Sequence, residues 1–151
     1  MNTTLGDLEL SIRRFAYDEA MNRAAIPSRS ELARALHTTE REVGVGLSHL
    51  ADAHMLALQR DSGEILMLNP FSAVPTPFAV RIGDRSWYGN CIWDAMGIAS
   101  MLHSDAVIDA SCGCCGSKIV LSVPRDCRDH DQRLVHFAIP AARWWADIVF
   151  S

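Results

Sequence analysis

The chain has 151 residues, of which 49% are hydrophobic and 21% charged, and its formal net charge is −4. This is a globular composition, and the length fits one medium domain or two small subdomains. It excludes a membrane span, because no apolar run is long enough, and the acidic charge argues against a large nucleic-acid footprint. Residues 1–10 lack a signal sequence and the five cysteines are an odd number, so we expect a cytoplasmic protein with reduced thiols.

Three helices are predicted near the N-terminus. Apolar side chains recur at helical spacing over residues 5–25, which predicts an amphipathic helix ending near Pro27. The capping-box pattern at 28–31 predicts a short helix from Glu31 to His37. The same pattern at 39–42 opens a third helix.

Two strands, 55–59 and 65–68, follow these helices and complete a winged-helix pattern. The last helix of such a fold can enter a DNA major groove. Up to Val80, however, the chain has seven Arg and no Lys against ten acidic residues. The phosphates of DNA would therefore repel this part unless dimerisation or a partner changed its electrostatic field. We favour a helical subdomain that covers the second half, and DNA binding is the less favoured alternative.

Residues 69–77 contain three prolines, which is typical of an extended linker across the surface. The expected organisation is therefore a winged-helix-like helical subdomain at 1–69, a Pro-rich linker at 70–77 and a core at 78–151.

The second half is predicted to be a mostly antiparallel sheet packed with helices, so the fold class is α+β. Pro140 is expected at the first position of a last helix that runs through Trp144 and Trp145. A further helix is expected after Asn90. The expected strands are 78–82, 86–88, 106–111, 118–123 and 134–139.

A thiol and a carboxyl, Cys91 and Asp94, lie three residues apart at the start of the helix that Asn90 is expected to cap. Positions i and i+3 share a helix face. A thiol in the first turn lies at the positive end of the helix dipole, which predicts a lowered pKa and a reactive cysteine. The alternative is that Cys91 is a small buried hydrophobe and Asp94 an ordinary first-turn acid.

Three more thiols, Cys112, Cys114 and Cys115, lie within a stretch of four residues, in a glycine-flanked turn. Thiolates select soft metals such as Cu(I), Hg(II) or Zn. A structural zinc site usually draws on two pairs of ligands, and only one compact cluster is visible, so zinc is disfavoured. The cluster either holds or delivers a thiophilic ion, or it is a turn whose cysteines tolerate burial. Cys127 is too distant to assign.

The segment 88–96, with its C-x-x-D element, followed by 107–112 and 119–124, resembles the organomercurial (alkylmercury) lyases. The resemblance extends over most of the chain and includes the helical N-terminal part. It implies a mercury-resistance enzyme that cleaves a carbon–mercury bond at Cys91 and Asp94. Cys112 matches a family cysteine that is generally considered structural.

The resemblance implies that Cys91 binds mercury and that Asp94 moves the proton. It implies organomercurials and small thiols as partners, no membrane, and no organic cofactor. Hg(II) or another soft metal would be substrate, product or ligand. The candidate metal ligands are Cys91, Asp94, Cys112, Cys114 and Cys115.

The family's second mercury-binding cysteine belongs after the Trp-rich helix, and no cysteine follows Cys127 in these 151 residues. With one thiol, catalysis is expected to be reduced or lost, unless Cys114 or Cys115 supplies the second ligand or the sequence is shortened at its end. The alternative function is a non-enzymatic sensor or carrier that binds Cu(I) or Hg(II) through Cys91 and the turn 112–115, coupled to DNA through the winged helix.

Overall fold

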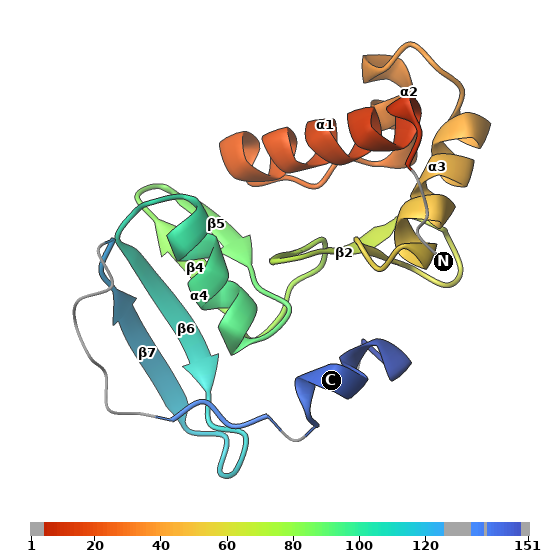
Figure 1. Ribbon diagram of the computed structural model, residues 1–151. Coiled ribbons are helices and arrows are strands. Elements are labelled where there is room, and N and C mark those ends of the chain that lie inside the picture. The colour runs from red at the N-terminus through yellow and green to blue at the C-terminus, as the bar shows by residue number, and fades with distance from the viewer. Residues whose placement is uncertain (1–4, 126–133, 138, 149–151) are drawn as a thin grey trace.

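The computed structural model describes residues 5–125, 134–137 and 139–148 (Figure 1). Its N-terminal part contains three helices, α1 (Asp7–Arg23), α2 (Arg29–Ala35) and α3 (Glu40–Asp52). Both expected capping boxes are present, since the side chains of Ser28 and Thr39 accept hydrogen bonds from the third backbone amide of α2 and α3. The three predicted helices are confirmed, and α2 begins two residues earlier than expected.

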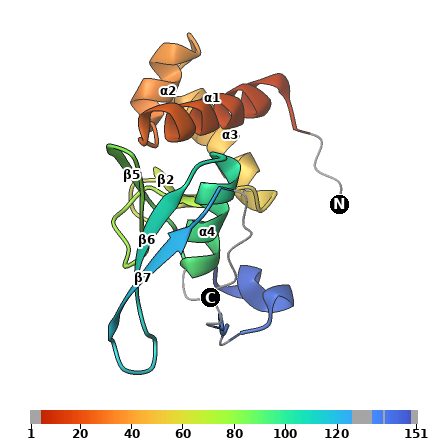
Figure 2. The ribbon, with the colours of Figure 1, turned by 90° about the vertical axis from the view of Figure 1, so that its left-hand side faces the viewer.

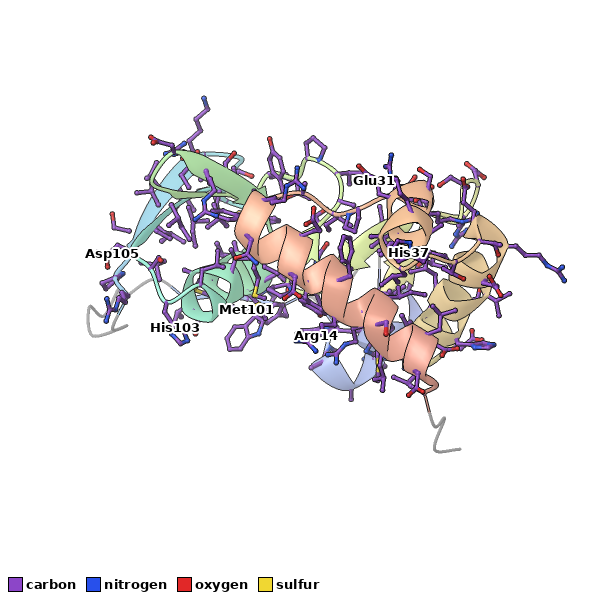
Figure 3. The ribbon with its side chains drawn as sticks, turned by 90° about the horizontal axis from the view of Figure 1, so that it is seen from above. Arg14, Glu31, His37, Met101, His103 and Asp105 are labelled. Atoms are coloured by element: carbon purple, nitrogen blue, oxygen red, sulfur yellow. The ribbon has the colours of Figure 1, made fainter. Side chains whose placement is uncertain are left out.

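The buried face of α1 packs against α3. Ile12 and Ala16 are fully buried, as are Leu47 and Leu50 on the facing helix. In Figure 3 the labelled residues Glu31 and His37 lie with α2, on the opposite side of the molecule from His103 and Asp105, which follow α4. The N-terminal helices are thus held together by one apolar core that is continuous with the core of the rest of the protein.

A three-stranded antiparallel sheet follows, with the strand order β1 (Ala57–Leu58), β2 (Ile65–Leu68) and β3 (Phe71–Ser72). Phe71 is only 1% exposed, and it forms a bridge to Gly89. The expected surface linker at 70–77 is therefore wrong at β3, because burial of a large aromatic side chain outweighs the proline-rich pattern. The boundaries of the expected domains stay a prediction.

The second sheet has the order β5-β4-β6-β7 and is antiparallel throughout. Its strands are β4 (Ala79–Ile82), β5 (Arg85–Tyr88), β6 (Ala106–Ser111) and β7 (Lys118–Val123). Helix α4 (Ile92–Met101) packs on one face, as Figure 2 shows. The α+β class and these four strands agree with the expectation from the sequence.

The two faces of this sheet differ in burial. Val80 and its partner Ile108 are fully buried on the face beneath α4. On the opposite face Arg81 pairs with Asp109 at the surface. Functional groups that need shielding from water therefore belong at the α4 side.

The last described segment differs from the prediction. Residues 134–137 form no strand, and Leu134 is 94% exposed. A 3₁₀ helix, η1 (Ala141–Ala146), replaces the expected last helix, with Pro140 at its N-cap. Aromatic contacts hold this segment, because Phe137 lies against Trp93 of α4. Within the described ranges, no helix has the length and apolar content needed to cross a membrane.

Candidate active site at the start of helix α4

The turn between β5 and α4 is fixed by Gly89. Its amide donates a hydrogen bond to the Phe78 carbonyl (3.0 Å), and its carbonyl accepts one from Thr76 Oγ1 (2.6 Å). A Cβ atom at this position would lie 2.5 Å from the backbone nitrogen of Ala95. Only glycine permits this close approach, which places the following residues against the first turn of α4.

The residue at the N-cap of α4 is Cys91, not Asn90. Cys91 has the extended backbone of a cap residue, with φ −144° and ψ −179°. The prediction that Asn90 caps the helix is wrong by one position, because the tight turn at Gly89 starts the helix later. The thiol is thus at the helix terminus itself, and the Asn90 side chain is available for another contact.

Asn90 holds the carboxylate of Asp94. Its Nδ2 atom donates to Asp94 Oδ2 at 3.1 Å and to Asn69 Oδ1 at 3.0 Å, and it lies 3.4 Å from the Pro70 carbonyl. Its Oδ1 atom is buried without a hydrogen-bond partner among the described residues. The three acceptors orient the amide so that its donor faces the carboxylate of Asp94.

The thiol of Cys91 and the carboxyl of Asp94 interact, and both side chains are half-buried. Burial raises the pKa of Cys91, while the backbone amide of Asp94 lowers it and the charge of Asp94 raises it. The predicted lowering of this pKa is therefore wrong. Removal of the thiolate from water outweighs the favourable field of the helix terminus.

Burial also raises the pKa of Asp94, against the lowering effect of its hydrogen bonds with Asn90 and Cys91. A carboxyl in this environment keeps its proton to a higher pH than one at the surface. The pair therefore combines a shielded thiol with a carboxyl that is suited to give up a proton.

The N-terminal half also reaches this site. Tyr17 of α1 donates a hydrogen bond to the Asn69 carbonyl at 2.7 Å. Burial raises the pKa of Tyr17, and the charge of Asp94 acts in the same direction. Sequence reasoning missed Tyr17 and Asn69, since they are far from Cys91 along the chain and carry no motif.

The other candidate ligands lie in the turn between β6 and β7. Cys112 is half-buried, whereas Cys114 and Cys115 are exposed. The thiol of Cys115 lies 3.2 Å from Ser117 Oγ, and hydrogen bonding by Ser117, followed by that of Cys112, lowers the pKa of Cys115. Cys127 lies outside the described residues.

The candidate ligands lie in two separate groups, one at the start of α4 and one in the turn between β6 and β7. In the part of the chain that the structure describes, no three His, Cys, Asp or Glu side chains come together to hold a metal ion. The two groups of candidate ligands nevertheless lie at the same end of the second sheet. Gly89 bonds to Phe78, and the adjacent Ala79 pairs with Asp109 near the end of β6.

The start of α4 thus places a half-buried thiol next to a half-buried acid on an α+β scaffold. The sequence profile of the alkylmercury lyases (MerB) matches residues 71–150, which include both residues of the pair. This match covers more than half of the 151 residues, and the chain belongs to the alkylmercury lyase family.

A solved structure with a similar fold is the mercury-bound form of MerB2. It matches with a TM-score of 0.62 and 20% sequence identity over 81% of this chain. The matched region spans 58% of the length of that chain. A comparison with curated proteins finds no match.

Proposed function

We propose that this chain cleaves carbon–mercury bonds by protonolysis, with Cys91 as the mercury-binding thiol and Asp94 as the proton donor. The observation that carries the proposal is the contact between the half-buried thiol and a half-buried carboxyl of raised pKa. Membership of the alkylmercury lyase family supports it. We also place the protein in the cytoplasm, where its thiols stay reduced.

The first step is exchange of the thiol onto mercury. The sulfur of Cys91 binds the mercury of R–Hg–X, the thiol proton is released, and X⁻ leaves. Because the thiol contacts Asp94, the released proton has an acceptor at the site. Mercury makes this exchange favourable despite the raised pKa of Cys91, since thiolate is its preferred ligand.

The second step is protonolysis. The electron pair of the carbon–mercury bond takes the proton of Asp94, and R–H leaves. A small thiolate takes the place of the carbon on mercury, so that Hg(II) keeps its oxidation state and two sulfur ligands. Asp94 is left ionised, and its hydrogen bond from Asn90 stabilises this form.

The test is hydrocarbon release from methylmercury or phenylmercury incubated with the protein and excess small thiol. Gas chromatography should detect methane or benzene, and Cys91→Ser should abolish it. Cys114→Ser is the matched control, because this exposed thiol lies outside the pair. Absence of hydrocarbon, together with tight Hg(II) binding, would contradict the lyase proposal.

That outcome would favour the second candidate, a non-enzymatic soft-metal carrier or sensor. The exposed thiols at the turn between β6 and β7 are the observation in its favour. Coupling to DNA would require a gel shift that persists at about 0.15 M salt, where weak electrostatic binding is screened.

A further inference from the structure

We infer that the turn between β6 and β7 is a second, separate metal site, in which Cys112 and Cys115 hold one soft d¹⁰ cation between two thiolates. Neither the family match nor the fold match assigns a function to this turn. The inference does not depend on whether Cys91 cleaves carbon–mercury bonds.

The backbone of the turn brings the two sulfurs together. Cys112 donates its amide to the Ser117 carbonyl at 2.9 Å, and Gly116 donates to the Cys112 carbonyl at 2.8 Å. Gly116 has φ +70°, a left-handed conformation that glycine adopts without strain. The closed turn keeps Cys115 near Cys112, and hydrogen bonding by the Cys112 side chain is one of the causes that lower the pKa of Cys115.

Ser117 supplies a hydrogen-bond partner for the thiol of Cys115. Its hydroxyl oxygen lies 3.2 Å from the sulfur of Cys115. When a metal ion displaces the thiol proton, the hydroxyl can rotate and donate to the thiolate, which stabilises the bound form. The exposed position of Cys115 gives an ion direct access from solvent.

The number of donors decides which ions fit. Among the residues that the structure describes, no third His, Cys, Asp or Glu side chain joins the pair to make a metal-binding group. Zinc in a structural site requires four ligands. Soft d¹⁰ ions such as Hg(II) and Cu(I) are satisfied by two thiolates in a linear arrangement, and thiolates select them. Binding releases two protons from the two thiols, and no electron is transferred.

The location of the turn suits it to receive Hg(II) released from Cys91, a role that rests on the proposed function. The turn lies beyond the end of β6, at the same end of the sheet as Gly89 and the start of α4. A mercuric ion released from Cys91 would first meet the exposed thiol of Cys115 and then be held between Cys115 and the half-buried Cys112.

The experiment uses the whole chain with Cys91→Ser, so that a missing lyase activity cannot affect the result. The probe is one equivalent of Hg(II), and retention is measured after gel filtration with about 0.1 mM competing monothiol. The second thiol of the pair acts at an effective concentration in the millimolar range, so Hg(II) should bind the protein roughly tenfold better than it binds the competing monothiol. X-ray absorption should then show two sulfur neighbours on mercury.

Adding Cys115→Ser should lower the apparent affinity about tenfold, because one thiol must compete without its neighbour. Cys112→Ser should do the same. Cys114→Ser is the matched control within the turn and should retain the ion, and circular dichroism confirms folding of each variant. Equal loss with Cys114→Ser, or full retention with Cys115→Ser, would overturn the inference.

Discussion

The start of α4 and the turn between β6 and β7 both present thiols, but they differ in what surrounds the sulfur. Cys91 is half-buried beside Asp94, and burial raises the pKa of its thiol. Cys115 is exposed beside a hydroxyl, and hydrogen bonding by Ser117 lowers the pKa of its thiol. The pKa of a cysteine thiol is therefore raised in one region and lowered in the other.

The difference shows which effect dominates at a helix terminus. The field of a helix N-terminus is worth about 0.3–1 kcal/mol at an exposed position. Removing a charged group from water can shift a pKa by several units when burial is complete. At Cys91 partial burial already outweighs the favourable field, and the neighbouring carboxyl adds to it. Partial burial therefore favours the protonated form of Cys91.

The largest expected effect comes from Asp94→Asn, which removes the acid but keeps the shape of the pair. Hydrocarbon release should fall at least about hundredfold, the usual contribution of a positioned general acid. Binding of the organomercurial should persist, since Cys91 remains. Asp109→Asn, at a surface ion pair, is the control and should leave the rate unchanged. A rate above about a tenth of the original would exclude Asp94 as the proton donor.

The same variant tests the direction of the pKa shift. A raised folded-state pKa of Asp94 contributes stability that is fully present at low pH and is lost as the pH rises through that pKa. At pH 7, which is above the ordinary pKa of a carboxyl, Asp94 therefore makes the folded state less stable than a neutral side chain of the same shape would. Asp94→Asn should raise the melting temperature at pH 7 and have less effect near pH 4. A lower melting temperature at pH 7 would contradict this direction.

Gly89→Ala should show that the start of α4 is tightly packed, whereas the turn between β6 and β7 is not. The added methyl group would meet the Ala95 backbone at 2.5 Å, so the turn or α4 must shift. We expect a loss of about 1–3 kcal/mol in the free energy of unfolding, as for other overpacked sites. Gly113→Ala is the matched control in the thiol-rich turn, because no atom lies within 4 Å of its Cβ position. Urea unfolding measures both, and equal losses would show that Gly89 is not constrained by α4.

The sequence predicted the features that depend on local chemistry. The capping boxes at Ser28 and Thr39, the antiparallel strands and the placement of Cys91 and Asp94 at the start of a helix all follow from residue type and spacing. Such features depend on interactions within a few residues, where propensity and pattern are informative.

The remaining features depend on contacts between distant segments. Phe71 is buried because the N-terminal helices and the second sheet meet around it, which the proline-rich pattern does not show. The orientation of Asn90 depends on Asn69, and the pKa of Cys91 depends on burial. No local pattern encodes burial beneath another segment, so the sign of the pKa shift was predicted wrongly.

A direct comparison of thiol reactivity sharpens the contrast between the two regions. At pH 7.5, iodoacetamide should modify Cys115 about tenfold faster than Cys91, because the thiolate is the reactive form and Cys115 is exposed. Cys114 controls for exposure, since it lies in the same turn. Mass spectrometry of digested peptides follows each site separately. If Cys91 reacts as fast as Cys115, burial does not govern its reactivity.

The smallest expected effect concerns the link from α1 to the pair. Tyr17→Phe removes the hydrogen bond to the Asn69 carbonyl, which should cost about 0.5–1.5 kcal/mol of stability. Because Asn69 also accepts from Asn90, the carboxyl of Asp94 should be held less firmly, and hydrocarbon release should fall by a few fold. Tyr88→Phe, at the chain's other tyrosine, controls for loss of a hydroxyl near the site. The thiols at the turn between β6 and β7 should keep their alkylation rates, because no part of this network reaches them; a change there would mean that the two regions are coupled.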